Sequence, residues 1–497
     1  MSAAENRPST GSDAGPCPPP TRREELVEEL HGHQVADPYR WLEAPSTDPE
    51  LREWVAAQAA CTEQHLAGVP ARNAFRSYLG QLWDHPRRGA PWRKADRWFQ
   101  LANDGHQDQD VLWTAPARPD EPRASLPPTE AWTVLIDPNT WTDDGTASLS
   151  GLSITDDGSR AAFARSDAGS DWLVWRIVEI ATGEVLDDEV TWSKFSTAAW
   201  LPDGEGFLYS AYEPPEEDQA YAAANRDQQL RYHLVGTDPA EDLLVHARPD
   251  QPEWNFFPAV SHDDRWLIIV VSHGTDPSNR IHVAPIDEGT IGAIRPLLDE
   301  GDASYLPLGV VGDELVVHTD LDAPLGRVVT IDLLNGEVRR ELIPAGEDRL
   351  QDATVIGAET SGRPGWLVTT RLHHATARMS VHELYDGTHL TDVDLPGLGT
   401  IPAVSGGRKD EAVHLTFETF TGPAAVLRVD LPASGATGSG STASLAAVEV
   451  TPPSAPPADH LVVDQVRVHH DGVAVPLFLI HRRDVTPDGT VPTVLWG

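Results

Sequence analysis

The sequence predicts a mainly β protein in which a β-propeller follows two short helices and precedes the start of a further domain. Three observations predict it: a helical pattern near the N-terminus, a strand-and-turn unit that recurs through the middle of the chain, and a hairpin pattern over residues 459–497. Repeats of about 40 to 50 residues with about four short strands each are typical of propellers. A β-sandwich could not place so many strands in one pair of sheets.

Two amphipathic helices are predicted first. Asp48 can cap a helix whose first position suits Pro49, and Gly68 ends that helix. A second helix is predicted over residues 71–82. Its inward-facing side chains are Phe75, Tyr78, Leu79 and Leu82. We interpret both apolar faces as core and not as functional surfaces.

The recurring unit is an aspartate-containing turn between two apolar runs. It is present at Asp157, Asp203 and Asp263, which are 46 and 60 residues apart. The longer interval contains an acidic insertion over residues 213–229. We interpret this insertion as a solvated loop, because it lacks the alternating ligands of a calcium-binding loop.

The second half of the predicted propeller repeats less clearly. Two dipeptides with turn chemistry mark hairpins there: Asn335-Gly336 and Asp386-Gly387. A tract rich in Gly, Ser, Thr and Ala over residues 435–444 predicts a surface loop, and the Pro-rich residues 451–457 predict a linker.

The closing stretch, residues 459–497, has the pattern of a second domain that has just begun. Asp471-Gly472 supplies a hairpin turn, after which residues 473–480 return as a strand, and residues 491–496 are predicted to form another short strand. The residues alone leave two alternatives: a whole protein, or the greater part of one whose chemistry lies beyond Gly497.

The bulk properties limit the possible partners and location. The net charge of −40 argues against nucleic acid as a partner, because phosphates are bound by Lys and Arg surfaces. No run approaches the roughly 18 apolar residues of a membrane helix, and residues 1–20 lack the pattern of a signal peptide. Cys17 and Cys61 are the only cysteines, and no structural disulfide is expected. These features predict a cytoplasmic protein.

The residues alone do not predict a catalytic or metal site. No serine carries the Gly-x-Ser-x-Gly turn that exposes the nucleophile of many hydrolases. Adjacent histidines on a strand point to opposite faces, and His31 with His33 lacks a third ligand, so no metal or cofactor is predicted. The adjacent pairs are His373 with His374 and His469 with His470. Four tryptophans are interpreted as packing between blades: Trp192, Trp200, Trp254 and Trp266.

A series of short motifs runs in order through the chain. They are His31-Gly32-His33, Asp37-Pro38-Tyr39-Arg40-Trp41-Leu42-Glu43, Gly169-Ser170-Asp171-Trp172, Lys194-Phe195-Ser196, Trp200 with Asp203-Gly204, Tyr232-His233 with Gly236-Thr237-Asp238 and Glu241-Asp242, Asp276-Pro277 with Asn279-Arg280, Val475-Pro476-Leu477-Phe478-Leu479-Ile480-His481 and Pro492-Thr493-Val494-Leu495-Trp496-Gly497. Together these residues resemble the prolyl oligopeptidase family of serine peptidases, from about Glu24 to Gly497.

The resemblance implies a seven-bladed β-propeller inserted into an α/β-hydrolase domain, of which only the N-terminal helices and first strands are present. The implied domains are a disordered tail, the helical part of the hydrolase domain, the propeller, and the truncated start of the remaining hydrolase domain. Their bounds are residues 1–20, 21–79, 80–455 and 456–497.

The implied function is that of a serine endopeptidase acting on short peptides, with cleavage after proline. The propeller would gate access to the active site. The nucleophilic serine, the acid and the histidine of the family would all lie beyond Gly497, so the chain alone is expected to be inactive. The implied partner is a short peptide, with no nucleic acid and no membrane, and the protein is expected to be a monomer. The alternative is a non-catalytic propeller that binds peptides or another protein.

Three substrate-binding positions follow from the resemblance. Phe195 matches an aromatic residue that lines the distal substrate pocket of the family. Asn255 and Thr275 replace a methionine and a cysteine of the same region, and Ser272 replaces an arginine that binds substrate in some members. The alternative for Phe195 is ordinary propeller core.

Overall fold

The computed structural model of the chain describes residues 17–45, 47–215, 224–358, 365–432, 445–451, 458–486 and 488–497. It consists of two compact units, Met1–Asp84 with Pro214–Ala224, and His85–Glu213 with Asn225–Gly497. Most of the predicted N-terminal tail and Pro-rich linker, all of the Gly/Ser-rich loop and part of the acidic insertion lie outside the described residues.

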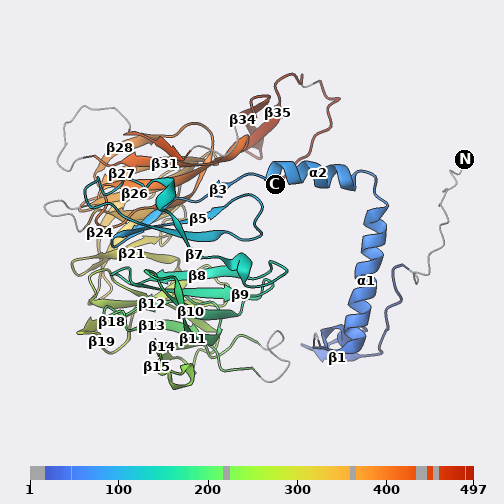
Figure 1. Cartoon of the computed structure of the whole chain (residues 1–497), viewed down its shortest axis with the longest axis horizontal. Helices are drawn as coiled ribbons and strands as arrows, with labels where there is room; N and C mark the ends of the chain where they lie inside the picture. The colour runs from blue at the N-terminus through green and yellow to red at the C-terminus, as the bar shows by residue number, and fades with distance from the viewer. Residues whose placement is uncertain are drawn as a thin grey trace, which may run out of the picture. The chain divides into compact units, whose positions relative to one another are not determined.

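The first unit contains the predicted helices and a small hairpin (Figure 1). Its elements are β1 Val27–Leu30, β2 His33–Ala36, the 3-10 helix η1 Arg40–Glu43, α1 Pro49–Ala67 and α2 Arg72–Trp83. The side chain of Asp48 accepts a hydrogen bond from the Leu51 N–H at 2.9 Å, and Gly68 is the C-cap of α1. The capping signals therefore located α1 correctly, and the prediction of α2 is confirmed to within one residue.

The predicted inward face of α2 is exposed. Phe75 and Tyr78 retain 64% and 59% of their accessible surface, and Leu79 and Leu82 about half of theirs. Within the described part of the first unit no residue of α2 is buried. The stripe has the periodicity of a core-facing helix, but this unit supplies no layer against it.

The expectation that the two cysteines are unpaired is wrong. Cys17 and Cys61 form a disulfide with their Cα atoms 5.4 Å apart. The segment after Cys17 runs along α1, since the Trp54 indole donates a hydrogen bond to the Thr21 hydroxyl at 3.0 Å. Sequence spacing could not show this approach, because 44 residues separate the cysteines. The cysteines thus give no support to a reducing compartment.

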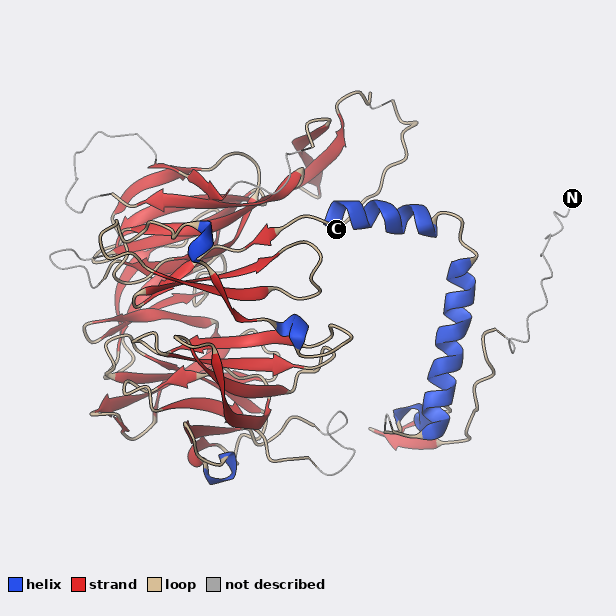
Figure 2. Cartoon of the chain, in the orientation of Figure 1, coloured by secondary structure: helices blue, strands red, loops and turns tan. Residues whose placement is uncertain are grey.

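The second unit is built of antiparallel sheets (Figure 2). The first three sheets contain β3 Arg87–Arg88, β4 Trp92–Lys94, β5 Arg97–Asn103, β6 Val111–Pro116 and β7 Thr133–Ile136; β8 Ser148–Ile154, β9 Arg160–Ser166, β10 Leu173–Glu179, β11 Glu184–Ser193, β12 Ala199–Trp200, β13 Gly206–Ala211, β14 Gln229–Leu234 and β15 Leu243–Ala247; and β16 Trp254–Val260, β17 Trp266–His273, β18 Asn279–Asp287, β19 Thr290–Ile291 and β20 Arg295–Ala303. The next three sheets contain β21 Tyr305–Val311, β22 Glu314–Thr319, β23 Arg327–Asp332 and β24 Val338–Ile343; β25 Arg349–Ile356, β26 Trp366–His373, β27 Thr376–Glu383, β28 His389–Asp394 and the parallel β32 Leu445–Ala446; and β29 Thr400–Ser405, β30 Ala412–Thr419, β31 Gly422–Asp430 and β33 Val448–Thr451. The last sheet is the hairpin of β34 Leu461–His470 and β35 Val473–Arg482. Short 3-10 helices are η2 Thr129–Ala131, η3 Pro138–Thr140 and η4 Pro239–Glu241.

Neighbouring sheets pack face to face through buried apolar clusters. One cluster joins Phe99 of β5 to Phe163 of β9, and another joins Trp366 of β26 to Leu415 of β30. The sheet that contains β3–β7 is also connected to the sheet that contains β29–β31, since the Ala90 N–H donates to the Thr416 hydroxyl at 3.0 Å. The sheets therefore close into a ring, and the predicted propeller-like, mainly β architecture is confirmed.

The aspartate turns predicted as a repeat occupy equivalent places in this ring. Asp157 connects β8 to β9, Asp203 connects β12 to β13, and Asp263 connects β16 to β17. Each carboxylate accepts a hydrogen bond from the backbone N–H two residues later, at 2.9, 3.0 and 3.4 Å. A short acidic side chain suits this turn because it satisfies a backbone donor that the strands leave unpaired.

The predicted hairpin near the C-terminus is present, with β34 and β35 joined at Asp471-Gly472. The short strand predicted over residues 491–496 is wrong, because those residues form no strand. A strand needs a partner, and in the described part of the chain none pairs with this segment. Its side chains Val494, Leu495 and Trp496 are exposed.

Candidate functional site

A cluster of aromatic side chains gathers around Lys194 at one end of the strands of the eight-stranded sheet. The register places Ser193, the last residue of β11, opposite Ala211 of β13, which in turn pairs with Gln229 of β14. The loops that follow or precede these residues therefore meet at one end of the strands. The ring-bearing members of the cluster are Trp172, Trp192, Phe195 and Tyr212.

The rings pack edge to face. Trp172 makes T-shaped contacts with Trp192 and Tyr212, at centroid separations of 5.5 and 6.1 Å. Phe195 and Trp192 are 37% and 36% exposed, whereas Tyr212 is buried. The cluster thus presents two ring surfaces on a buried aromatic base, an arrangement suited to an apolar or ring-shaped ligand group.

Lys194 is buried among these rings, with 9% of its surface exposed. Its ammonium lies 4.7 Å from the ring centre of Trp172 and 5.5 Å from that of Phe195, within the range of cation–π attraction. Nζ donates a hydrogen bond to the Asn225 side-chain oxygen at 3.0 Å. A positive charge is therefore held at the centre of an apolar cluster.

The backbone on both sides of Lys194 is left-handed. Trp192 has a φ of 58° and Phe195 a φ of 50°, values that bulky residues seldom adopt. The buried amide of Gln228 supports this conformation by donating to the carbonyls of Lys194 and Phe195 at 2.8 and 3.3 Å. Its oxygen accepts the Phe256 N–H at 2.6 Å. Strained residues held by surrounding contacts are common at functional sites.

The structure brings Phe195 and Asn255 into this cluster. Asn255 is buried, and its side-chain oxygen accepts a hydrogen bond from the Tyr212 hydroxyl at 2.6 Å. Burial raises the pKa of Tyr212 to about 12, so the phenol remains a neutral donor. Asn255 pairs with Ser272 across β16 and β17, and Thr275 is exposed in the turn that follows β17. No hydrogen bond between Thr275 and the cluster is found among the described residues.

Sequence reasoning did not assign Trp192, Tyr212 or Gln228 to this site. Trp192 was interpreted as packing between blades, as Trp200 and Trp254 do, yet it is the most exposed of the three. No local pattern marks these three residues, since they lie in or beside three different strands, β11, β13 and β14. The Lys194-Phe195 pair within a family motif was the only signal available.

A buried histidine lies at the other end of the same sheet. The His233 side chain is fully buried between two carboxylates, with Nδ1 2.8 Å from Asp242 and Nε2 3.0 Å from Asp188. Burial opposes the charged form, but the hydrogen bonds to Asp242 and Asp188 outweigh it and raise the pKa of His233. Asp242 also accepts from the Tyr209 hydroxyl at 2.6 Å. These contacts fasten β11, β13 and β14 to the segment after η4.

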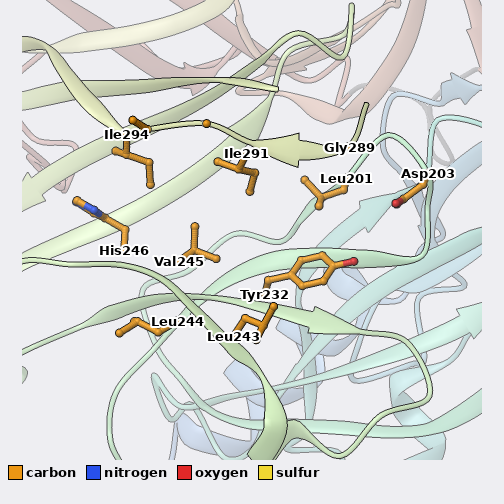
Figure 3. Close-up of a pocket in the computed structure, with 12 residues that line it drawn as sticks. Leu201, Asp203, Tyr232, Leu243, Leu244, Val245, His246, Gly289, Ile291 and Ile294 are labelled. Atoms are coloured by element: carbon orange, nitrogen blue, oxygen red, sulfur yellow. The ribbon is translucent and has the colours of Figure 1, made fainter. Parts of the chain in front are cut away.

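A pocket of about 600 Å³ is lined by residues 243–246 of β15 and by residues of the turns at Asp203 and Gly289 (Figure 3). Its walls are mainly aliphatic, and its polar groups include Asp203, Tyr232 and His246. Burial lowers the pKa of His246 to about 4, with His282 adding to the effect, so that this imidazole is neutral. None of the three predicted substrate-binding residues lines this pocket.

No metal centre is assigned. In the described ranges no three His, Cys, Asp or Glu side chains come together as ligands. His373 and His374 do not face opposite sides, because His374 leaves the strand at a φ of 51° and the two ring centroids are 4.1 Å apart. His373 instead contacts the Asp348 carboxylate at 2.9 Å.

Within the described ranges, the helices are too short or too polar to span a bilayer.

The closed ring of sheets defines a β-propeller protein, and the aromatic cluster lies at one end of the strands of its eight-stranded sheet. The chain belongs to the prolyl oligopeptidase family. Residues 18–437 match the family described as "Prolyl oligopeptidase, N-terminal beta-propeller domain". The resemblance inferred from the motifs is thereby confirmed.

Curated relatives carry peptidase names. The chain is 26% identical over 482 residues to a prolyl endopeptidase of Elizabethkingia meningoseptica, covering 96% of this chain and 63% of that protein. It is 28% identical over 505 residues to the dual function macrocyclase-peptidase POPB of Amanita bisporigera, covering 96% of this chain and 66% of the relative. The chain thus spans slightly less than two thirds of these relatives.

Two solved structures show the same architecture. One, from a study of two prolyl endopeptidases and their inter-domain dynamics, is 33% identical with a TM-score of 0.68, covering 94% of this chain and 64% of that structure. The other is prolyl oligopeptidase B from Galerina marginata bound to a 25mer macrocyclization substrate. It is 25% identical with a TM-score of 0.80, covering 94% of this chain and 66% of that structure.

Proposed function

We propose that this chain supplies the propeller and flanking segments of a serine endopeptidase that cleaves short peptides after proline. The family match over residues 18–437 carries the proposal, and the relatives named as prolyl endopeptidases support the substrate class. The aromatic cluster around Lys194 is the part of this chain that contacts the peptide. Exposed Phe195 and Trp192 rings suit the flat face of a proline ring.

The ring has seven blades in this proposal. The eight-stranded sheet counts as two blades, because a single paired position, Ser193 with Ala211, joins its halves. Trp175 of the first half also packs against Phe207 of the second across a buried cluster. Residues of one flat sheet could not face each other in that way. The other five sheets of the ring then supply one blade each.

The helical segment 21–79 and the hairpin segment 456–497 are proposed to belong to one α/β-hydrolase domain, with residues 80–455 as the propeller between them. The exposed apolar face of α2 supports this assignment, since such a face is normally covered in a folded enzyme. The propeller limits access to the active site, so that short peptides enter and folded proteins do not.

The chain by itself is proposed to bind peptide without cleaving it. Its sequence has no Gly-x-Ser-x-Gly turn, and the cluster offers ring faces, an ammonium and amides but no activated nucleophile. A cytoplasmic monomer without nucleic acid or membrane partners remains the proposed setting. The binding chemistry of the cluster equally favours the second candidate function, a non-catalytic propeller that binds peptides or proteins.

An assay separates these two functions. Protein expressed from the full open reading frame that encodes this sequence is incubated with an N-capped peptide whose fluorogenic leaving group follows a single proline. We expect turnover that a serine-directed inhibitor abolishes, and a raised KM in the Phe195→Ala variant. The 497-residue chain is expected to give no turnover. If the product of the full reading frame binds the peptide but leaves it intact, the binding-module function replaces the peptidase.

A further inference from the structure

Lysine is rare in this protein, and Lys194 is the buried one. Of 37 Lys and Arg residues, only Lys94, Lys194 and Lys409 are lysines. Lys94 is half-exposed and pairs with the Asp156 carboxylate, as surface lysines commonly do. Lys194 is more than nine-tenths buried, which is unusual for a group that water solvates strongly.

Several arginines of the second unit have acidic partners. Three arginines contact carboxylates at 3.3, 2.7 and 4.0 Å: Arg226 with Glu253, Arg248 with Asp250, and Arg280 with Asp299. Lys194 differs, because none of the carboxylates in the described ranges forms an ion pair with it. Its partners are the neutral amide of Asn225 and two aromatic rings. Its charge is therefore not neutralised by the described residues.

The ammonium also retains hydrogen-bonding capacity. It has three N–H donors, and Asn225 receives one of them. The rings of Trp172 and Phe195 attract a cation through their faces but do not replace a hydrogen-bond acceptor of opposite charge. An anion that approached beside the exposed Phe195 ring would meet a positive charge in a poorly solvated setting, where charge-assisted hydrogen bonds are strong.

We infer that Lys194 binds a carboxylate of the peptide, so that this site selects peptides with an acidic group near the proline. The inference rests on the proposed function, since it assumes that the cluster binds peptide. The carboxylate comes from an Asp or Glu side chain or from a free C-terminus, which share the same chemistry. Phe195 and Trp192 contact the apolar part of the ligand, and the Lys194 ammonium binds its carboxylate.

The overall charge of the protein makes this selectivity distinctive. A net charge of −40 repels acidic peptides at long range, and salt screens that repulsion over about 10 Å at 0.1 M. A contact with buried Lys194 is screened much less. The preference for an acidic peptide should therefore persist or increase when salt is added, opposite to the behaviour of a diffuse basic surface.

The test measures binding to the 497-residue chain by fluorescence polarisation, with dye-labelled octapeptides that contain one proline. Three versions are compared: Glu beside the proline with an amidated C-terminus, Gln at that position with an amidated C-terminus, and Gln with a free C-terminal carboxylate. We expect at least one acidic version to bind about tenfold more tightly than the amidated Gln peptide. Comparison of the two acidic versions identifies the source of the carboxylate.

Variants assign the preference to the residue. Lys194→Met should remove it, Lys194→Arg should retain part of it, and the matched control Lys94→Met should leave it unchanged. Near-ultraviolet circular dichroism checks that each variant is folded. The wild-type comparison needs no variant, so the inference can fail even if Lys194→Met does not fold.

The outcomes separate this inference from the proposed function. Equal binding of all three peptides by the wild-type chain overturns the role of Lys194 and leaves peptide binding intact. A preference that survives in Lys194→Met also overturns it. If no peptide binds at all, the peptide site fails first and this inference fails with it.

Discussion

The two buried basic side chains of the eight-stranded sheet, His233 and Lys194, lie at opposite ends of its strands and have opposite surroundings. His233 is enclosed by two carboxylates, one of which also accepts a hydrogen bond from the Tyr209 hydroxyl, so the groups that favour its charged form lie inside the protein. Lys194 has one amide and two ring faces. A compensated buried charge holds a fold together, whereas an uncompensated one leaves attraction available for a ligand.

Removing a partner of His233 should give the largest effect. Asp242→Ala leaves the buried imidazole with one carboxylate and strands the Tyr209 hydroxyl, so we expect a loss of about 3–5 kcal/mol in the free energy of unfolding. Urea denaturation followed by tryptophan fluorescence measures the loss. The control Asp250→Ala, at an exposed ion pair, should change stability little. Equal losses of stability in Asp242→Ala and Asp250→Ala would show that the buried contacts of His233 stabilise the fold no more than an exposed ion pair does.

Replacing Gln228 should give the second largest loss of stability, because its amide supports the site and the packing beneath it. Gln228→Ala leaves two carbonyls and the Phe256 N–H without partners in a buried region, which costs about 2–3 kcal/mol. Peptide binding should weaken as well, since the left-handed turn at Phe195 loses its support. Unchanged stability with intact binding would show that the turn does not depend on this residue.

The contribution of His233 to the free energy of unfolding should depend on pH. The pKa of His233 is raised in the folded state, so its contribution is fully present below the ordinary value near 6.5 and is lost as pH rises through the folded pKa. The stability difference between the wild type and His233→Gln should therefore shrink as pH rises through that window. Unfolding curves at several pH values measure it, and a constant difference would indicate a neutral imidazole.

Lys194→Met should give the smallest change in stability, within about 1 kcal/mol. The variant loses two cation–π contacts and one hydrogen bond but no longer buries an unpaired charge. Thermal melting of this variant beside Asp242→Ala tests the comparison directly. A loss as large as that of Asp242→Ala would show that Lys194 is a structural residue.

Local signals in the sequence predicted much of this fold. The Asp48 and Gly68 caps located α1, and the aspartate turns at Asp157, Asp203 and Asp263 located equivalent hairpins of the ring. These predictions succeeded because each depends on residues a few positions apart. The count of seven blades and the hydrolase domain came from family resemblance and remain proposals.

Features that depend on distant residues could not be predicted in this way. The Cys17–Cys61 disulfide depends on how a segment lies along α1, and the cluster around Lys194 combines residues in or beside five strands, β10, β11, β13, β14 and β16. Trp192 shows the difference most clearly, since its sequence context resembles that of the buried tryptophans. Only the left-handed turn of the chain brings its ring to the surface.

The junction between the first and last sheets of the ring has a mechanical consequence. In the described residues these sheets share no strand, and side chains such as Arg123 and Asp410 join them in place of a backbone ladder. A tensile load applied through residues 85 and 458 would reach this seam while every hairpin still resisted as a unit. We therefore expect the ring to open at this junction before any hairpin unfolds.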